Sequence, residues 1–167
     1  MSVLDILTYP DDRLKNRSAE VTDIDDELQR FIRDLEATRR AGPGAVGIAA
    51  PQVGMQQRIV IVDVSNTRKP CDNHGHMIMI NPEITEWDGM VMGREGCLSV
   101  PDFTGNVIRA ETIKLNYLDE TGQRHDIESS GFEARAIQHE MDHLDGLLVL
   151  DRLVSRRTDL FKRKVYK

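Results

Sequence analysis

The spacing of apolar residues predicts two helices, one in each half of the chain. The first carries apolar side chains at the interval of one helical face: Ile24, Leu28, Phe31 and Leu35. Asp23 precedes them and is placed to cap this helix, whose other face is charged. The second helix opens at Ser130, because Glu133 three residues later completes the pattern of a capping box, and it ends or bends at Gly146.

Apolar runs between the two helices predict strands. Residues 58–64 are almost continuously β-branched, which indicates a strand buried on both faces. Residues 77–82 form a short strand that an Asn-Pro pair stops, and residues 84–92 form another. Residues 112–118 alternate between apolar and polar side chains and turn back into 123–128 as a hairpin.

Three further segments predict how the ends and one central stretch are built. Residues 1–22 have few periodic apolar positions and are expected to form an arm lying on the domain. Residues 45–54 are mostly small, so either chain segments pack closely there or a loop offers its backbone and the Gln52 amide to a ligand. Residues 151–167 combine basic side chains with an apolar stripe, which predicts a basic helical tail.

This order of elements predicts an α+β fold in which antiparallel β-sheets pack around the second helix. A chain of 167 residues is enough for a single domain spanning 1–167. The hydrophobic fraction of 40% and the charged fraction of 30% are typical of a soluble globular protein.

Charge and cysteine content narrow the class of protein. The net charge of −6 gives no general indication of nucleic-acid binding, so no DNA partner is expected. No segment approaches the roughly 20 apolar residues of a membrane span, and the N-terminus does not have the pattern of a signal peptide. Cys71 and Cys97 lie in dissimilar surroundings, which disfavours a disulfide. We expect a reduced, cytoplasmic monomer without a membrane partner.

The second predicted helix carries a metal-binding pattern. His139 and His143 are one helical turn apart, with Cβ atoms about 5–6 Å from each other, so both imidazoles can bind one ion. Glu140 lies beside them, where it can handle a proton of a water molecule at the metal. Only roughly 0.01 accidental His-Glu-x-x-His matches are expected in a chain of this composition. Two ligands alone do not make a metal site, however.

The third ligand has to come from upstream of this helix or be missing. Thermolysin-like proteases take it from a downstream glutamate, and no glutamate follows Glu140. Metzincin proteases take it from a downstream histidine, whose place is held here by Val149.

The upstream candidates are histidines and cysteines: His74, His76, His125, Cys71 and Cys97. Cys97 is the best of them, because it ends a strand and Gly96 before it frees the backbone. A thiolate with two imidazoles leaves one tetrahedral position open, as in catalytic sites. A buried, inert cysteine remains the alternative.

Three segments, in this order, resemble the motifs of the peptide deformylase family. They are residues 47–52, Glu95-Gly96-Cys97-Leu98-Ser99 and Gln138-His139-Glu140-Met141-Asp142-His143-Leu144-Asp145-Gly146. The resemblance extends over nearly the whole chain. It implies the fold of that family and a hydrolase that removes the formyl group from the N-terminal formyl-methionine of newly made polypeptides, releasing formate.

The resemblance also implies a role for each motif residue. The implied metal ligands are Cys97, His139 and His143. Glu140 is implied as the acid–base residue, while the Gln52 side chain and the Leu98 backbone N–H hold the formyl oxygen. Family members use Fe(II) in the cell and also bind Zn, Ni or Co, whereas the ligand types alone indicate zinc.

The substrate side of the site follows from the same resemblance. The implied substrate-binding residues are Val46, Gly47, Ile48, Gly96, Phe132 and Ala136. Phe132 and Ala136 also share the inward face of the second helix with His139, so plain core packing is the alternative for both. Glu95 and Arg109 match positions that pair in the family and brace the cysteine segment.

Three positions depart from the family pattern and make peptide preference less certain than the chemistry. Ala45 stands where the first motif usually has glycine, and Ile48 replaces its usual leucine. Thr104 occupies a position that is arginine in some bacterial members and helps to bind the main chain of the substrate.

Two other functions remain open from the sequence. One is a metallopeptidase that cuts ordinary peptide bonds, and the other is a structural-metal or peptide-binding protein without turnover. Besides formyl-methionyl nascent peptides, a further partner is the ribosome, on which a basic C-terminal helix docks in some bacterial deformylases. Residues 151–167 are short for that role.

Overall fold

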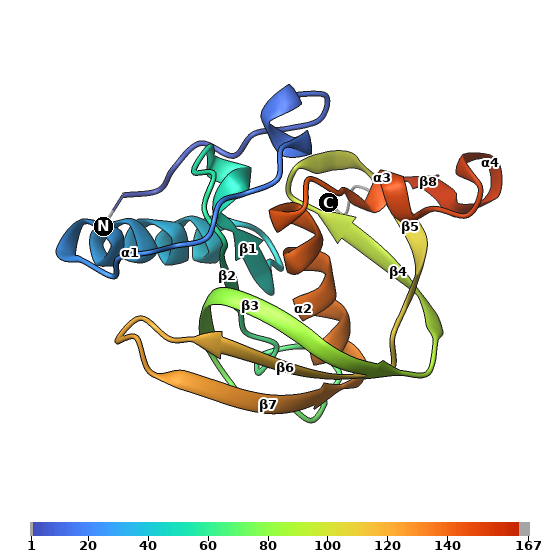
Figure 1. The fold of residues 1–167 in the computed structure, drawn as a ribbon. Coiled ribbons are helices and arrows are strands. Elements are labelled where there is room, and N and C mark those ends of the chain that lie inside the picture. The colour runs from blue at the N-terminus through green and yellow to red at the C-terminus, as the bar shows by residue number, and fades with distance from the viewer. Residues whose placement is uncertain (1, 164–167) are drawn as a thin grey trace.

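The computed structural model describes residues 2–163 as two antiparallel sheets with one helix between them (Figure 1). The helices are η1 Asp12–Lys15, α1 Asp26–Ala41, η2 Ala50–Val53, α2 Gly131–Leu144, α3 Val149–Arg152 and α4 Arg156–Asp159. The strands are β1 Gly47–Ala49, β2 Ile59–Val62, β3 Met77–Asp88, β4 Val91–Cys97, β5 Val100–Arg109, β6 Thr112–Leu118, β7 Arg124–Ser130 and β8 Leu160–Lys162. The larger sheet has the order β1-β2-β3-β6-β7 and the smaller one β4-β5-β8, which confirms the predicted α+β class with the motif on the central helix.

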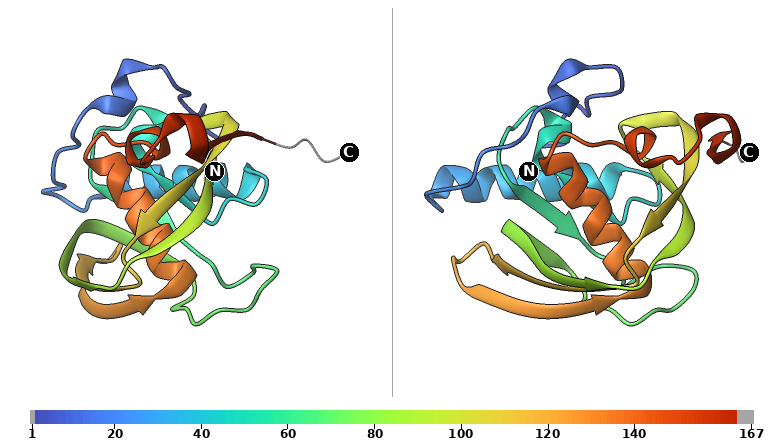
Figure 2. Two further views of the ribbon diagram at one scale, coloured as in Figure 1. Left: turned by 90° about the vertical axis from the view of Figure 1, so that its right-hand side faces the viewer. Right: turned by 45° about the vertical axis from the view of Figure 1, so that its right-hand side comes forward.

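Helices cover both faces of β2, which explains its continuous apolar sequence. Val60 and Val62 belong to a core with Ile137 and other residues of α2. Ile59 and Ile61 belong to a second core, with the inward face of α1. All four β2 side chains are completely buried, as the sequence predicts. In Figures 1 and 2, α1 and α2 accordingly lie on opposite sides of β2.

The predicted N-terminal cap of the first helix is wrong, whereas the second helix has its N-cap at Ser130 as predicted but lacks the capping box. The first helix begins later, because the Asp25 carboxylate, and not Asp23, accepts a hydrogen bond from the backbone N–H of Leu28 at 2.8 Å. The second begins after Ser130, but the Ser130 side chain makes no capping bond. The carboxylate of Glu133 is used elsewhere, since it accepts hydrogen bonds from the loop before β3 and from the end of β7.

The Asn-Pro pair does not end a strand as predicted. One strand, β3, runs through Asn81 and Pro82, and its pairing with β6 shifts register between Ile80 and Glu83. Asn81 has φ of 51°, and its side-chain amide pairs with both backbone groups of Val21, at 2.8 and 2.9 Å. The register shift leaves Pro82, which lacks an N–H, without a required partner in the ladder. The predicted segments 77–82 and 84–92 are therefore mostly one long strand.

Residues 45–54 are not simply a loop. They contain β1, which pairs with β2, and the single 3-10 turn η2, which places Gln52 in the interior. The N-terminal segment lies across this region as the predicted arm. The Leu7 N–H donates to the Gln52 carbonyl at 2.7 Å, and the Tyr9 N–H donates to the Ser99 carbonyl at 2.8 Å.

The prediction of one helical tail over 151–167 is wrong for the residues that are described. Helix α3 ends at Arg152, α4 is a single turn, and β8 then pairs with β5. Leu153 and Leu160 pack on the core beneath β5, whose open edge supplies backbone partners that a continuing helix would leave unused. The last predicted tail residues, 164–167, lie outside the described part. Within 2–163, no helix is both long enough and apolar enough to cross a membrane.

Candidate metal centre and active site

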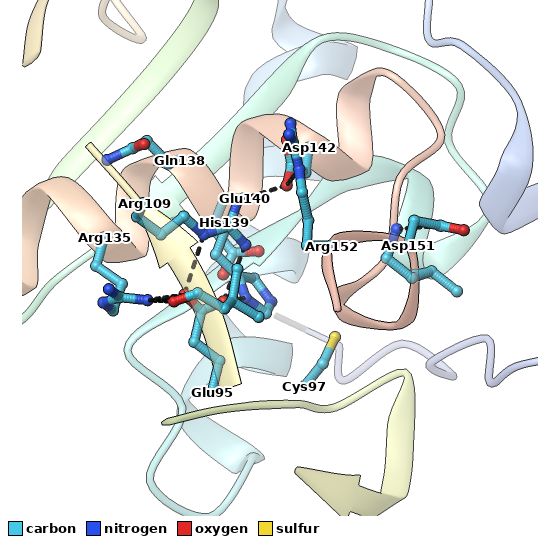
Figure 3. A network of polar contacts seen from close by, with 12 residues as sticks. Glu95, Cys97, Arg109, Arg135, Gln138, His139, Glu140, Asp142, Asp151 and Arg152 are labelled. Carbon is cyan, nitrogen blue, oxygen red and sulfur yellow. Dashed lines mark hydrogen bonds and ion pairs between the residues drawn. The ribbon is translucent and has the colours of Figure 1, made fainter. Parts of the chain in front are cut away.

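The three expected ligands come together where the end of β4 meets α2. The ligand atoms of Cys97, His139 and His143 all lie within 4.8 Å of one another. Cys97 is 6% exposed and His143 2%, and the Cys97 Sγ lies 3.4 Å from the His143 Nε2. Figure 3 shows Cys97 facing the helix from the neighbouring strand segment. The helix thus supplies two ligands, and a strand far from it in sequence supplies the third.

The donor set fits a bound divalent metal. Burial alone would raise the pKa of the Cys97 thiol, but His143 and His139 lower that pKa well below its usual value, so the sulfur is held as the thiolate that metals bind. The His139 Nδ1 is hydrogen-bonded to Glu95 at 2.8 Å, which leaves its other ring nitrogen for an ion. A thiolate and two imidazoles suit zinc or iron.

Glu95 braces this centre from behind. It is 7% exposed and accepts hydrogen bonds from the Arg109 Nε and Nη2, at 3.0 and 2.9 Å, and from the Arg135 Nη1 at 2.7 Å. Burial alone would raise the pKa of Glu95, but His139 and Arg109 hold it far below its usual range. The expected ion pair of Glu95 with Arg109 is therefore present, and its carboxylate stays ionised.

The ionic network extends further than the sequence indicated. Arg109 also pairs with Asp142 of α2, and Asp142 accepts two hydrogen bonds from Arg152 of α3, at 2.9 and 2.7 Å (Figure 3). Sequence reasoning missed this extension, together with the role of Arg135. Arg135 did carry a pattern, because it precedes His139 by one helical turn and so lies on the same side of α2.

Gln52 is fixed in one orientation beside the sulfur. Its Oε1 accepts from the Ala49 N–H at 2.9 Å, and its Nε2 donates to the Ser99 Oγ at 3.1 Å. The same Nε2 lies 3.7 Å from the Cys97 Sγ. The amide donor therefore points into the site, and Ser99 is a supporting residue that the sequence analysis did not single out.

Glu140 is buried next to the ligand cluster. It is 5% exposed, and its Oε1 has no hydrogen-bond partner among the described residues. That oxygen lies 4.0 Å from the His143 Nε2. Burial raises the pKa of Glu140. An unpartnered, buried carboxylate oxygen at a metal-ligand cluster is suited to receive a proton from a water molecule.

A cavity of about 430 Å³ opens on this centre. All but three of the site residues expected from the sequence line it: Val46, Gly47, Gln52, Glu95, Gly96, Cys97, Leu98, Phe132, Ala136, His139 and Glu140. Arg109 and His143 are buried behind the wall. Ile48 is also absent from the lining among residues 2–163, because its side chain is fully buried in the core beneath α1.

The other histidines are used elsewhere. The His74 Nδ1 is 2.6 Å from Glu133, the His76 Nε2 is 3.1 Å from Glu36, and the His125 Nε2 is 2.7 Å from Asp119. Within residues 2–163, no second group of three His, Cys, Asp or Glu side chains gathers closely enough to hold a metal ion.

Comparison with known proteins identifies the family. The model of the family described as polypeptide deformylase matches residues 3–159. The chain belongs to the peptide deformylase family. A deformylase of Desulfosudis oleivorans is 45% identical over 168 residues, which are 100% of this chain and 95% of that protein.

Solved deformylase structures share the fold. The deformylase of Ehrlichia chaffeensis, in complex with actinonin, has a TM-score of 0.87 at 36% identity, covering 94% of this chain and 92% of that one. The Met-Ala-Ser-bound class I type b deformylase of Acinetobacter baumannii has a TM-score of 0.83 at 41% identity, covering 92% and 100%. This chain is thus a metal-dependent hydrolase with peptide deformylase activity, which removes the N-formyl group from nascent peptides. The metallopeptidase and non-enzyme alternatives are set aside.

Proposed function

We propose that this deformylase acts on N-terminal formyl-methionine through Glu140 and one divalent metal ion held by Cys97, His139 and His143. The observation that carries the proposal is the buried, unpartnered Glu140 Oε1 beside these three ligands. It supports the role of Glu140 as proton acceptor, because this residue also lines the cavity that receives the substrate.

The expected metal in the cell is Fe(II), and Zn, Ni or Co can take its place in purified protein. The thiolate and the two imidazoles support this range of ions, and the choice of iron rests on the family resemblance. When bound, the ion lowers the pKa of a water molecule and polarises the formyl carbonyl.

Glu140 moves the proton. It accepts a proton from the water molecule as the water oxygen bonds to the formyl carbon. It then delivers that proton to the methionine nitrogen as the carbon–nitrogen bond breaks, so that formate and a free amine leave. Its raised pKa suits this work, because a carboxylate with a low pKa would accept a proton less readily near neutral pH.

Two donors of the chain stabilise the negative oxygen that develops on the formyl group. They are the Gln52 Nε2, whose direction is fixed by the Ala49 N–H and the Ser99 hydroxyl, and the Leu98 backbone N–H. Removing one such donor typically lowers the rate by about 10²–10³-fold.

The methionine side chain occupies the cavity. Val46, Phe132 and Ala136 give it an apolar wall, and the backbones of Gly47 and Gly96 flank the substrate main chain. Ile48 contributes through its main chain alone, because its side chain belongs to the core.

The enzyme acts in the cytoplasm, as a monomer and one domain, on formyl-methionyl nascent chains. Ribosome binding through the basic tail is a second part of this proposal. Arg156 and Arg157 are exposed on α4, whereas Leu160, Phe161 and Lys162 pair with β5. Changing both to glutamine abolishes salt-sensitive ribosome binding if the tail is the contact.

A formate-release assay tests the proposed function. Protein purified without oxygen and analysed for metal is expected to release formate from formyl-Met-Ala-Ser and to leave acetyl-Met-Ala-Ser uncut. A chelator removes this activity, and Fe(II) restores it. Fully metal-loaded protein that releases no formate would overturn the proposal.

A further inference from the structure

Three basic side chains line the catalytic cavity, although the chain as a whole has a net charge of −6. They are Arg94, Arg135 and Arg163. Arg135 is already used, because it donates to Glu95 and to the carbonyls of Val91 and Val107. Arg94 and Arg163 are held differently, and the hydrogen-bond partners of each guanidinium group determine which ligands it can bind.

Arg163 directly follows β8, and its side chain extends over Gly96, the residue before Cys97. Phe161 pairs with Thr104, and the Arg163 N–H donates to the Asp102 carbonyl at 2.9 Å, which continues the strand register. Because side chains alternate along a strand, Arg163 lies on the same face as Phe161. Its guanidinium covers Gly96 so closely that a Cβ on that glycine would fall 2.6 Å from the Nη2.

The donors of Arg163 are largely unused. The Nη2 reaches the Cys97 carbonyl at 3.5 Å, and the buried Nε has no hydrogen-bond partner among residues 2–163. A guanidinium has five N–H donors in a planar fork, and a buried donor without a partner is unfavourable. A ligand that enters the cavity beside Gly96 can supply the missing acceptors.

Arg94 stands next to Arg163 and is held by neutral groups. Its guanidinium carbon lies 3.6 Å from the centre of the Phe161 ring, and its Nε donates to the Asn106 side chain at 3.0 Å. Its Nη1 reaches the Thr104 hydroxyl at 3.5 Å. These contacts orient the guanidinium without neutralising its charge.

The acidic groups of the cavity do not compensate these two charges. Glu95 is saturated by Arg109, Arg135 and His139. Glu140 lies buried among the metal ligands. Within the described part of the chain, no carboxylate oxygen lies within 4.0 Å of a guanidinium nitrogen of Arg94 or Arg163.

We propose that Arg163 and Arg94 bind a carboxylate of the formyl peptide, so that this enzyme prefers substrates with an acidic group shortly after the formyl-methionine. This inference rests on the proposed function and adds a preference to it. Arg163 reaches the substrate only because β8 brings residue 163 beside Gly96, so the preference depends on this part of the tail as well as on the motifs.

The test compares amidated peptides that differ at one position: formyl-Met-Ala-Glu, formyl-Met-Ala-Gln and formyl-Met-Ala-Lys. A fourth peptide, formyl-Met-Ala-Gln with a free C-terminus, distinguishes an acidic side chain from a terminal carboxylate. We expect kcat/KM to fall in the order Glu, Gln, Lys, with about three- to tenfold between Glu and Gln, mostly in KM. The preference should shrink at high salt, because Arg94 is exposed and Arg163 is only half-buried, so salt can screen their charges.

Variants assign the preference to these two side chains. Arg163→Gln and Arg94→Gln should each reduce it, and Arg163→Lys should keep part of it because the charge remains. Lys162→Gln is the matched control: it removes the same charge from the neighbouring residue, but its side chain points to the opposite face and does not line the cavity. This variant should retain the full preference.

Each other outcome overturns the proposal in a recognisable way. Equal kcat/KM for the Glu, Gln and Lys peptides means that Arg94 and Arg163 do not distinguish substrates by their charge. A lower KM for all peptides in Arg163→Gln means that Arg163 covers the cleft and does not bind substrate. If metal-loaded enzyme releases formate from none of the peptides, the proposed function fails together with this inference.

Discussion

Glu140 occupies the space that a side chain at position 47 would need. A Cβ on Gly47 would fall 2.5 Å from the Glu140 Oε2 and 2.8 Å from its Cγ. Position 47 is therefore restricted to glycine by the Glu140 side chain, and β1 and α2 approach closely at the proposed proton acceptor.

Gly47→Ala should displace the Glu140 carboxylate and lower kcat/KM by about 10²-fold, because displacements near 1 Å have effects of this size in active sites. Metal content should remain near one ion per chain. Gly75→Ala is a suitable control, since it introduces a Cβ at a positive φ with no atom within 4 Å, at a residue that does not line the cavity. It should lower stability slightly and leave formate release unchanged. Wild-type activity in Gly47→Ala would contradict the steric account.

Glu140→Ala should retain the metal and lose turnover, by about 10²–10⁴-fold, because the ligands are untouched and only the proton acceptor is removed. Metal analysis and formate release on the same preparation check this. Glu140→Gln, which keeps the shape, should be equally impaired. Near-normal turnover in either variant would exclude Glu140 as the acid–base residue.

Glu95→Gln should weaken both metal binding and folding. It leaves Arg109 buried without its main counter-charge, which typically lowers the free energy of unfolding by about 3–5 kcal/mol. It also removes the carboxylate that orients His139, which typically weakens metal affinity about 10–100-fold.

Denaturant unfolding and metal titration measure these two effects. Arg124→Gln removes an exposed ion pair with Asp126 and should change stability by less than about 1 kcal/mol. If Glu95→Gln is as mild as this control, the buried network does not support the site.

Stability should depend on the ionisation of Glu36 at acidic pH. Burial alone would raise its pKa, but hydrogen bonds from Arg39, Arg40 and His76 lower it to about 2. Because the pKa is lower in the folded than in the unfolded chain, the unfolded chain binds more protons between these values. The stabilisation is complete above an unfolded pKa near 4.3 and is lost as the pH falls toward 2.

Glu36→Gln should therefore be less stable than the wild type by about 1 kcal/mol at pH 7, a value reduced by the solvent around the carboxylate. The difference should diminish below about pH 5. Unfolding curves of both proteins between pH 3 and 8 check this. Glu86→Gln, which removes an exposed pair with Lys114, should show no such trend. A constant difference across this pH range would exclude Glu36 as its source.

The ligand set could be predicted from the sequence because each part carries a local pattern. His139 and His143 have a fixed helical spacing, and Cys97 lies in a distinctive glycine-containing segment. The strand buried on both faces and the β6–β7 hairpin were equally readable, because periodicity records which faces are covered.

What could not be predicted depends on contacts between distant segments. Asn81-Pro82 normally stops a strand, but here the arm binds the Asn81 side chain and stabilises the irregular pairing. The tail becomes a strand because β5 offers it an open edge, which no pattern within 151–167 reveals. The same pairing brings the Arg163 side chain to the cavity, so the sequence could not predict that Arg163 lines it.

The N-terminal arm, residues 1–22, is synthesised first but hydrogen-bonds to a helix end that is synthesised much later. The Ser18 N–H donates to the Leu144 carbonyl at 2.8 Å, so residues made early complete their bonding only after the end of α2 has been made. Such pairings between distant residues form slowly, because a long loop has to close first. A chain that has not yet been synthesised through α2 accordingly lacks both this bond and a finished cavity, which α2 residues line.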